Sequence, residues 1–222
     1  MVAARLAAMS LRERLATARL YLVCDARPPD WLRAALRGGV ELVQLRDKTL
    51  GDDALVAAAR AFRTAADEAG ALFILNDRPD LVAACGADGV HVGQDDETPA
   101  AARAAVGHER IVGRSTHAPE QADAAVADPD VDYLAVGPVH VTPTKPGRPA
   151  AGLDYVEYAA RTVTKPWFAI GGLDASTVGA AVDRGARRIV VVRAITGAAD
   201  PEAAARALRR ALDEERVAAT RA

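Results

Sequence analysis

The sequence predicts an α/β protein, a single (β/α)8 TIM barrel formed by residues 1–222, with an extra helix before the first strand. Short runs rich in β-branched and other aliphatic residues alternate with Ala-rich stretches along the whole chain. Each gap between two such runs has room for one helix, as repeated parallel crossovers require. No long linker or low-complexity tract divides the chain, and a length of 222 residues suits one domain.

Eight segments are expected to form the strands of the barrel. They are Leu20–Cys24, Leu42–Leu45, Leu72–Leu75, Gly89–Val92, Ile111–Ser115, Tyr133–Gly137, Trp167–Ile170 and Arg188–Val192. An open doubly wound sheet is the competing fold, but no G-x-G-x-x-G motif follows the first strand. Unusual polar residues follow many different strands, which favours a closed barrel because its mouth gathers side chains from all of them.

Proline, capping and glycine signals mark the helices between these strands. Prolines suited to a first turn are Pro79, Pro99 and Pro119, and the expected N-cap residues are Asp52, Asp154 and Ser176. Glycines suited to a left-handed helix end are Gly39, Gly86 and Gly185, and the helix from Asp52 is expected to end near Gly70. A final helix is expected from Pro201, and the extra N-terminal helix around Arg5–Thr17.

Charge and composition exclude several classes of protein. The chain has 28 basic and 30 acidic residues, which argues against the basic surface of a nucleic-acid-binding protein. Aromatic residues are only 4% of the chain, so the core should consist of Ala, Val, Leu and Ile. Cys24 and Cys85 fit no metal or disulfide spacing, and no signal peptide or apolar run of roughly 18 residues is present. We therefore expect a cytoplasmic protein without nucleic-acid or membrane partners; a homo-oligomer stays open.

The expected mouth begins with basic and amide side chains after the second strand. Active-site residues of this fold lie at the C-terminal strand ends and in the loops after them. Strand alternation places Gln44 and Arg46 on one side and Leu45 on the other, with Lys48 just beyond. A guanidinium and an ammonium suit a phosphate group, and a Gln inside a barrel strand costs free energy unless it is paired. The alternative is a solvated strand end.

Carboxylates follow the third and fourth strands. Asn76 and Asp77 come directly after one strand, and Asp96 lies in the loop after the next. Two carboxylates at neighbouring strand ends can share Mg²⁺, which leaves its other positions to water and substrate phosphate. Helix capping is the alternative for each aspartate, because Asp77 precedes Pro79 and Asp96 precedes Pro99.

The remaining strand ends suggest a second anion-binding region. Ser115 after the fifth strand has no obvious base near it in the sequence, so a binding hydroxyl is favoured over a nucleophile; His117 could be structural or a catalytic base. The loop after the sixth strand holds Thr142, Thr144 and Lys145 between prolines, with a plain surface loop as the alternative. The seventh and eighth strands end in Gly171-Gly172 and Val192-Arg193, where this fold often binds phosphate. Together these features predict an enzyme that acts on two phosphorylated groups.

In order, the strand ends resemble those of the thiamine-phosphate synthase family from Leu20 to Ile195. The matching combination is QLRDK, Asn-Asp, HVGQDD, Gly-x-Ser, GPVHVTPTK and IGG. The resemblance implies a role for each position. Gln44, Arg46, Lys48 and Asn76 would hold a pyrimidine diphosphate, with Ser115 and Lys145 facing it; Asp77 and Asp96 would bind Mg²⁺; Thr142, Thr144 and Gly172 would hold the phosphate of a thiazole partner, beside Val192 and Arg193.

The implied reaction is dissociative. Pyrophosphate leaves the pyrimidine methylene, and the thiazole nitrogen attacks the resulting cation. Such a reaction asks the protein mainly to stabilise the charge of the leaving group, and needs no nucleophilic residue.

Two positions depart from the family pattern, and two alternatives stay open. His140-Val141 stands in place of an aromatic residue and proline, and Arg193 in place of serine. Arg193 is expected to join Thr142 and Thr144 in holding the thiazole phosphate, and the alternative for it is a salt bridge to a neighbouring carboxylate at the barrel rim. A thiazole tautomerase on the same barrel would carry histidine at the position of Pro138 and lack the complete QLR-x-K set. A non-catalytic phosphate-ligand sensor would not need both Asp77 and Asp96.

Overall fold

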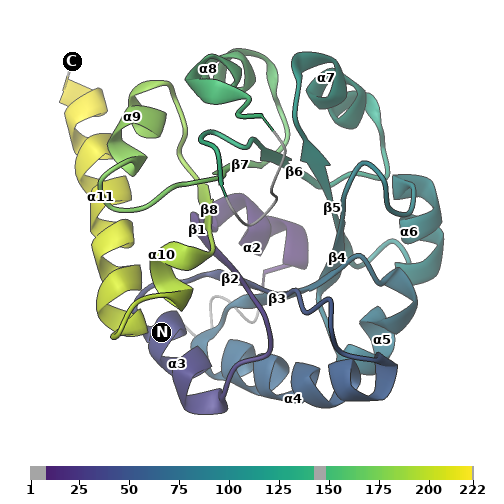
Figure 1. Ribbon diagram of the computed structural model, residues 1–222. Coiled ribbons are helices and arrows are strands. Elements are labelled where there is room, and N and C mark those ends of the chain that lie inside the picture. The colour runs from purple at the N-terminus through teal and green to yellow at the C-terminus, as the bar shows by residue number, and fades with distance from the viewer. Residues whose placement is uncertain (1–8, 143–148, 222) are drawn as a thin grey trace.

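The computed structural model describes residues 9–142 and 149–221, with side chains up to residue 213, and it has the predicted fold. Eight parallel strands follow one another around a closed barrel, with helices outside it (Figure 1). The strands are β1 (Leu20–Cys24), β2 (Leu42–Leu45), β3 (Leu72–Asn76), β4 (Gly89–Val92), β5 (Ile111–Thr116), β6 (Tyr133–Val136), β7 (Trp167–Ile170) and β8 (Ile189–Val191). Each overlaps its predicted segment, with ends that differ by one residue or none.

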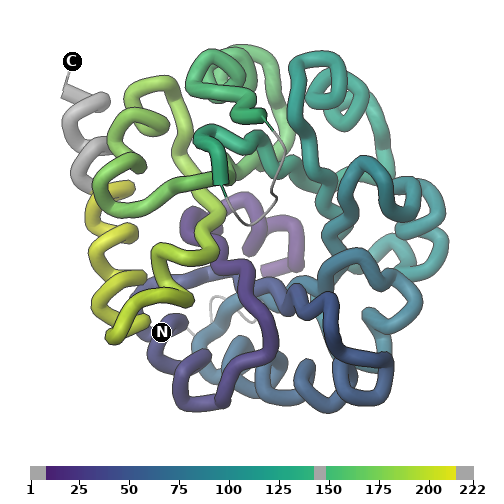
Figure 2. The backbone as a smooth tube through the Cα atoms, in the orientation of Figure 1, coloured from purple at the N-terminus to yellow at the C-terminus, as the bar shows by residue number. Residues whose placement is uncertain are grey.

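Closure comes from the pairing of the first and last strands. Leu20 and Tyr21 of β1 lie opposite Ile189 and Val190 of β8, which excludes the open sheet. The chain runs once around the ring, so that its last helix returns beside the first part of the chain (Figure 2). The close approach of Gly38 to Ala205 fixes this return, since a Cβ at Gly38 would lie 2.6 Å from the Ala205 Cβ.

The helices occupy the predicted gaps. They are α2 (Leu11–Thr17), α3 (Pro29–Arg37), α4 (Asp52–Ala69), η1 (Pro79–Leu81), α5 (Val82–Cys85), α6 (Pro99–Val106), α7 (Pro119–Ala127), α8 (Gly152–Thr162), α9 (Val178–Asp183), α10 (Arg193–Thr196) and α11 (Pro201–Arg221). All three predicted first-turn prolines begin a helix, although Pro79 begins a 3-10 turn. None of the described helices is long and apolar enough to cross a membrane.

The predicted N-cap residues are wrong at three helices. Helix α8 begins at Gly152, before Asp154, and α9 begins at Val178, after Ser176. Asp52 is the first residue of α4 rather than its cap, and its carboxylate pairs with Arg78 at 2.6 Å. In each case the predicted side chain pairs with another residue, or it lies one or two residues away from the N-cap position. The glycine predictions are confirmed, because the three predicted helix-end glycines all have positive φ, from 65° to 108°.

Two apolar layers hold the barrel together. Alternate strand residues point outward and pack against the helices in a layer rich in Ala, Val and Leu. The barrel interior is different, because Tyr21, Tyr133 and Phe168 meet there edge to face, with ring centroids 5.5–6.1 Å apart. The expectation of a largely aliphatic core is confirmed in both layers, and the three aromatic rings lie among the Leu, Val and Ile side chains of the interior cluster.

Helix α2 closes the N-terminal end of the barrel and lies in the centre of the ring in Figure 1. Its Leu15, 1% exposed, joins the interior cluster, with Leu11 packed against it. Ser10 and Glu13 form a capping box at its start. Of the predicted Arg5–Thr17 helix, residues 5–8 lie outside the described part of the chain.

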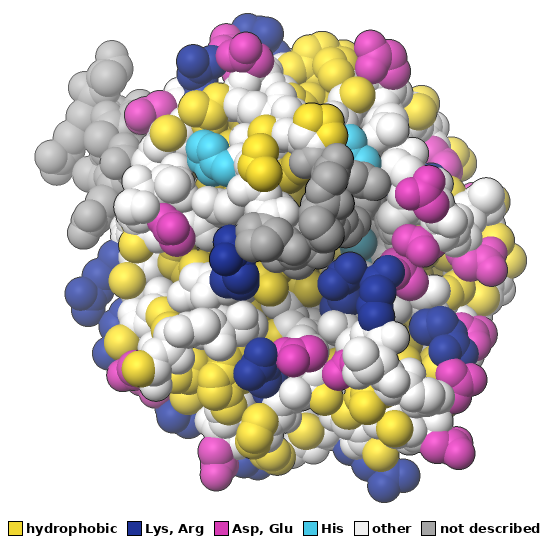
Figure 3. Space-filling view, viewed as in Figure 1, with side chains coloured by type: hydrophobic (Ala, Val, Ile, Leu, Met, Phe, Trp, Pro, Cys, Tyr) yellow, Lys and Arg dark blue, Asp and Glu magenta, His cyan; other side chains and the backbone are white. Residues whose placement is uncertain are grey.

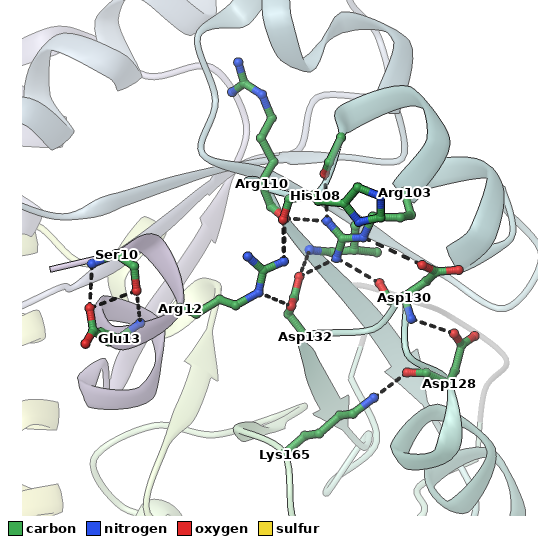
Figure 4. A network of polar contacts seen from close by, with 12 residues as sticks. Ser10, Arg12, Glu13, Arg103, His108, Arg110, Asp128, Asp130, Asp132 and Lys165 are labelled. Carbon is green, nitrogen blue, oxygen red and sulfur yellow. Dashed lines mark hydrogen bonds and ion pairs between the residues drawn. The ribbon is translucent and has the colours of Figure 1, made fainter.

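A polar network ties α2 to the strand starts (Figure 4). Arg12 donates to the Asp132 carboxylate at 2.8 Å and to the His108 carbonyl at 2.7 Å. Asp132 also accepts from Arg103 at 2.6 Å and from the Val112 amide at 2.8 Å. Since Arg103 is only 6% exposed, its charge needs these partners, and removal of Asp132 would leave a buried charge unpaired at a large cost in stability.

Candidate functional site

The C-terminal strand ends surround a cavity of about 340 Å³. Lys and Arg side chains gather near the centre of the face in Figure 3, beside Asp and Glu side chains. The cavity is lined by every predicted site residue in the described part of the chain: Gln44, Arg46, Lys48, Asn76, Asp77, Asp96, Ser115, Thr142, Gly172, Val192 and Arg193. Two further predicted residues, Thr144 and Lys145, lie outside the described residues.

Strand β2 turns Gln44 into the barrel and Leu45 out of it. Gln44 is 2% exposed and donates its amide N–H to the Tyr21 hydroxyl, while Leu45 packs into the outer apolar layer. The Arg46 amide continues the pairing by donating to the Cys24 carbonyl at 2.8 Å. Gln44 is thus paired, as a polar group in a barrel strand must be, and the alternation predicted here is confirmed.

The carboxylates of Asp77 and Asp96 meet at the mouth with Lys48. The Asp77 Oδ2 atom lies 3.5 Å from the Lys48 Nζ and accepts a hydrogen bond from the Asn76 amide at 2.6 Å. Burial first, and then the neighbouring Asp96 charge, raise the pKa of Asp77, while Lys48 and Asn76 oppose the shift. Two adjacent carboxylates of this kind favour a bound cation between them.

Backbone conformation aims Asp77 at the cavity. Its φ of 58° places it in the left-handed region, the one described non-glycine residue with a positive φ. Its amide still donates to the His91 carbonyl at 2.9 Å, so the turn begins while β3 and β4 are still paired. Such a conformation costs of order 1 kcal/mol and collects at functional sites.

Arg114 holds the loop that carries Asp96, a role that the sequence reading missed. Its Nη1 donates to the carbonyls of Gly93 at 2.6 Å and Glu97 at 3.2 Å, on either side of Asp96. The Asp96 Oδ2 accepts from the Gly93 amide at 3.0 Å, inside the same loop. The guanidinium therefore fixes both ends of the segment from which the carboxylate projects.

A chain of hydrogen bonds crosses the interior below the mouth. It starts at Gln44 and passes through the hydroxyls of Tyr21 and Tyr133, which are 3.0 Å apart, to His91 and Ser115. His91 contacts the Tyr133 hydroxyl through Nδ1 at 3.0 Å and the Ser115 hydroxyl through Nε2 at 2.9 Å. Sequence reasoning identified Gln44 and Ser115 but missed the three residues between them. The sequence signal that could have identified Tyr21, His91 and Tyr133 is that each has a polar side-chain atom at a strand position that faces the barrel interior.

His117 has a structural contact. Its Nδ1 donates to the Gly137 carbonyl at 2.6 Å, and its amide donates to Gln121 at 2.8 Å. The structural alternative for this histidine thus has direct support.

The opposite wall is built from the loops after β6 and β7. The amides of Val139 and His140 donate to the carbonyls of Ile170 and Gly171 at 2.8 and 3.0 Å, which extends the strand pairing into the loops. Gly172 has a φ of 66°, and a Cβ there would lie 2.7 Å from the His140 Cβ. Only glycine fits this crossing.

Arg193 is exposed on this wall, at the first residue of the short helix α10. It lines the cavity together with Val192 and the half-buried Thr142. No residue in the described ranges pairs with its guanidinium, so the alternative of a salt bridge at the barrel rim finds no support there.

Comparison with known proteins gives consistent results. Residues 20–195 match the family described as thiamine monophosphate synthase. The chain is 51% identical over 209 residues to a thiamine-phosphate synthase of Thermobifida fusca, covering 91% of this chain and 96% of that protein. It is 55% identical over 202 residues to one from Thermus thermophilus, covering 87% and 97%. The solved thiamine phosphate pyrophosphorylase of Pyrococcus furiosus superposes with a TM-score of 0.82 at 29% identity, covering 93% and 99% of the two chains.

Proposed function

The chain belongs to the thiamine monophosphate synthase family, and we propose how its barrel mouth performs the reaction of that family. It is an enzyme of thiamine biosynthesis, a transferase that forms thiamine phosphate and releases pyrophosphate. Its substrates are a phosphorylated pyrimidine and a phosphorylated thiazole. The proposal assigns 4-amino-2-methyl-5-(diphosphomethyl)pyrimidine to the β2–β5 side and 4-methyl-5-(2-phosphoethyl)thiazole, or its carboxylated form, to the β6–β8 side.

One observation carries the assignment of the diphosphate: the cluster of Lys48, Asp77 and Asp96, with Arg46 on the same cavity wall. The cationic side chains alone would bind any phosphate group and would not favour a diphosphate. Two adjoining carboxylates would repel a phosphate unless a divalent cation lay between them, and a diphosphate offers oxygens that can complete its coordination.

The donor set fits Mg²⁺. No group of three or more His, Cys, Asp and Glu suited to a metal exists among the residues that the structure describes. Asp77 and Asp96 supply two hard oxygen ligands, and the substrate and water would supply the others. When bound, the ion would neutralise charge on the departing pyrophosphate.

The protein's own groups then stabilise the leaving group and orient the partners. Arg46, Lys48 and Lys145 would bind the diphosphate oxygens, and Ser115 would donate to the same substrate from β5. Gln44 and Asn76 would hold the pyrimidine side. As the bond from the methylene carbon to oxygen breaks, both electrons leave with pyrophosphate, and the thiazole nitrogen supplies the pair for the new bond. The fixed cations act where negative charge develops.

The thiazole phosphate would bind on the other wall. The backbone of Gly172 and the side chains of Thr142, Thr144 and Arg193 would contact its oxygens, and Val192 would line the ring. A guanidinium can hold two phosphate oxygens at once, so Arg193 is expected to replace the serine of the family pattern with a stronger contact.

The decisive experiment measures pyrophosphate and thiamine phosphate with each precursor alone and with both together. We expect equal amounts of the two products only when both precursors and Mg²⁺ are present. Thiazole isomerisation without pyrophosphate release would indicate a tautomerase instead. Full turnover in a strong chelator would contradict the role of the metal and leave the assignment of substrates intact.

A further inference from the structure

The hydrogen-bonded chain inside the barrel links the two sides of the pyrimidine site, and its residues come from five strands. Gln44 lies on β2, Tyr21 on β1, Tyr133 on β6, His91 on β4 and Ser115 on β5. All five are at most 8% exposed. Their bonds are side chain to side chain, so the barrel wall does not require them for its own hydrogen bonding.

The donors and acceptors of this chain can be placed in order. Gln44 directs its amide nitrogen, which can only donate, at the Tyr21 hydroxyl. The contacts alone allow either direction, but the Tyr133 hydroxyl is the other polar partner of the Tyr21 hydroxyl, so only donation from Tyr21 to Tyr133 leaves no buried Tyr21 proton unpaired. Tyr133 then directs its proton at the Nδ1 atom of His91. Burial raises the pKa of both tyrosines, so each keeps the single proton that this order needs.

The order fixes the tautomer of His91. A neutral imidazole has one N–H and one acceptor nitrogen. With Nδ1 accepting from Tyr133, the proton is on Nε2, which donates to the Ser115 hydroxyl oxygen. Ser115 therefore keeps its own hydroxyl proton for an acceptor in the cavity. Gln44 uses its amide nitrogen toward Tyr21, which leaves its carbonyl oxygen available to accept on the far wall of the cavity.

We propose that Tyr133 is a positioning residue, which sets the His91 tautomer and thereby makes Ser115 a hydrogen-bond donor and Gln44 an acceptor toward the pyrimidine substrate. This inference rests on the proposed function for the identity of that substrate. The space for Tyr133 is specific, because a Cβ at Gly113 would lie 2.1 Å from the Tyr133 ring. The ring also packs edge to face against Tyr21 and Phe168, which holds its hydroxyl in place.

The test compares two variants that each lose one buried tyrosine hydroxyl. Tyr133→Phe removes the hydroxyl between Tyr21 and His91 and keeps the ring. Tyr155→Phe is the matched control, because the Tyr155 hydroxyl donates at 2.8 Å to Thr116, the neighbour of Ser115, from outside the barrel. Both should unfold at similar urea concentrations.

The first readout is ¹⁵N NMR of His91 in protein labelled at histidine, with His91→Asn to assign its signals. Wild type and Tyr155→Phe should show the proton on Nε2, and Tyr133→Phe should show a mixed pattern. A proton on Nδ1 in the wild type, or an unchanged pattern in Tyr133→Phe, overturns the proposal. This readout needs no turnover, so it stands whether or not the proposed reaction is observed.

The second readout is steady-state kinetics with each substrate varied. Tyr133→Phe should lower kcat/KM for the pyrimidine diphosphate about threefold to tenfold, the effect of one misdirected hydrogen bond, and leave the KM for thiazole phosphate unchanged. Equal losses for both substrates, or the same loss in Tyr155→Phe, would show a merely structural role and overturn the proposal.

Discussion

The Asp77 carboxylate is held 3.5 Å from the Lys48 ammonium, yet burial and Asp96 raise its pKa above the ordinary value of 3.8. The pKa of Asp77 is higher in the folded protein than in the unfolded chain, so ionisation of this carboxyl destabilises the fold. The stability is lost as the pH rises from the unfolded-state pKa through the folded-state pKa. At neutral pH this cost is fully present. The residue thus weakens the fold in order to offer a charged ligand at the mouth.

Asp77→Asn should therefore raise the free energy of unfolding of the metal-free protein at pH 7, and raise it less at pH 4. Asparagine tolerates the left-handed conformation, so the turn should survive. Activity should fall by most of its value because a metal ligand is lost. Urea unfolding at both pH values, with and without Mg²⁺, measures the free energy of unfolding of the wild type and the variant. If Mg²⁺ stabilised both proteins equally, the role of Asp77 as a metal ligand would be contradicted.

Arg193→Ser restores the residue of the family pattern and tests the second wall. We expect a higher KM for thiazole phosphate, by roughly tenfold for one charge-assisted contact, with little change for the pyrimidine diphosphate. Steady-state rates with each substrate varied decide the point. A change in thermal stability with unaltered kinetics would show that Arg193 serves the fold instead.

The residues missed by sequence reasoning share one property. Tyr21, His91 and Tyr133 are each unremarkable in their own strand, and their importance appears only when the barrel brings three strands together at one depth. Arg46, Lys48, Asp77 and Asp96 could be found because strand ends are visible in the sequence and parallel strands end on one face. Depth within the barrel depends on the stagger of the strands, which no local pattern encodes.

At the scale of elements, the loops after β6 and β7 are locked together at Gly172. Gly172→Ala should destabilise the protein by about 1–3 kcal/mol, since an alanine there adopts a left-handed conformation and its Cβ meets His140. The same shift of the loops should weaken thiazole-phosphate binding.

Gly86→Ala is the matched control for this substitution. Gly86 has a left-handed conformation, with φ 65° and ψ 24°, and its added Cβ would make only an ordinary contact of 3.6 Å with the flexible Arg63 side chain, so it measures the backbone cost, about 1 kcal/mol. Urea unfolding and KM for thiazole phosphate should separate the two variants. Equal losses of stability would mean that the contact with His140 contributes nothing.

Strands were predicted more accurately than helix starts, and the reason is physical. A barrel strand is buried on both faces and mostly apolar, so its sequence run stops where burial stops, as at Leu45, which is followed by the half-buried Arg46. Helix starts depend on the path of the preceding loop. Asp174 shows this, since its carboxylate accepts from the Ser176 amide at 2.8 Å and takes Ser176 as a turn residue before α9 begins. No sequence signal distinguishes these two uses of Ser176.

At the scale of the whole molecule, α2 is the part of the structure that lies outside the repeating pattern of strand and helix. Leu15→Ala should lower the free energy of unfolding by about 2–5 kcal/mol, because the side chain is buried against the interior cluster and leaves a cavity. Thr17→Ala, an exposed change on the same helix, should cost far less. Equal urea midpoints would show that α2 is not part of the cooperative unit.

Because α2 closes the N-terminal end of the barrel, it also affects whether the thiazole or water reacts with the pyrimidine cation. A pyrimidine cation is captured by any nearby nucleophile, and water is one at high concentration. Leu15 and the Tyr21, Tyr133 and Phe168 rings fill the barrel below the mouth, so among the described residues the mouth is the route by which water arrives. Once both substrates fill that mouth, the thiazole nitrogen is the nucleophile in reach, and hydrolysis of the diphosphate without coupling is suppressed by the packing at the opposite end of the barrel.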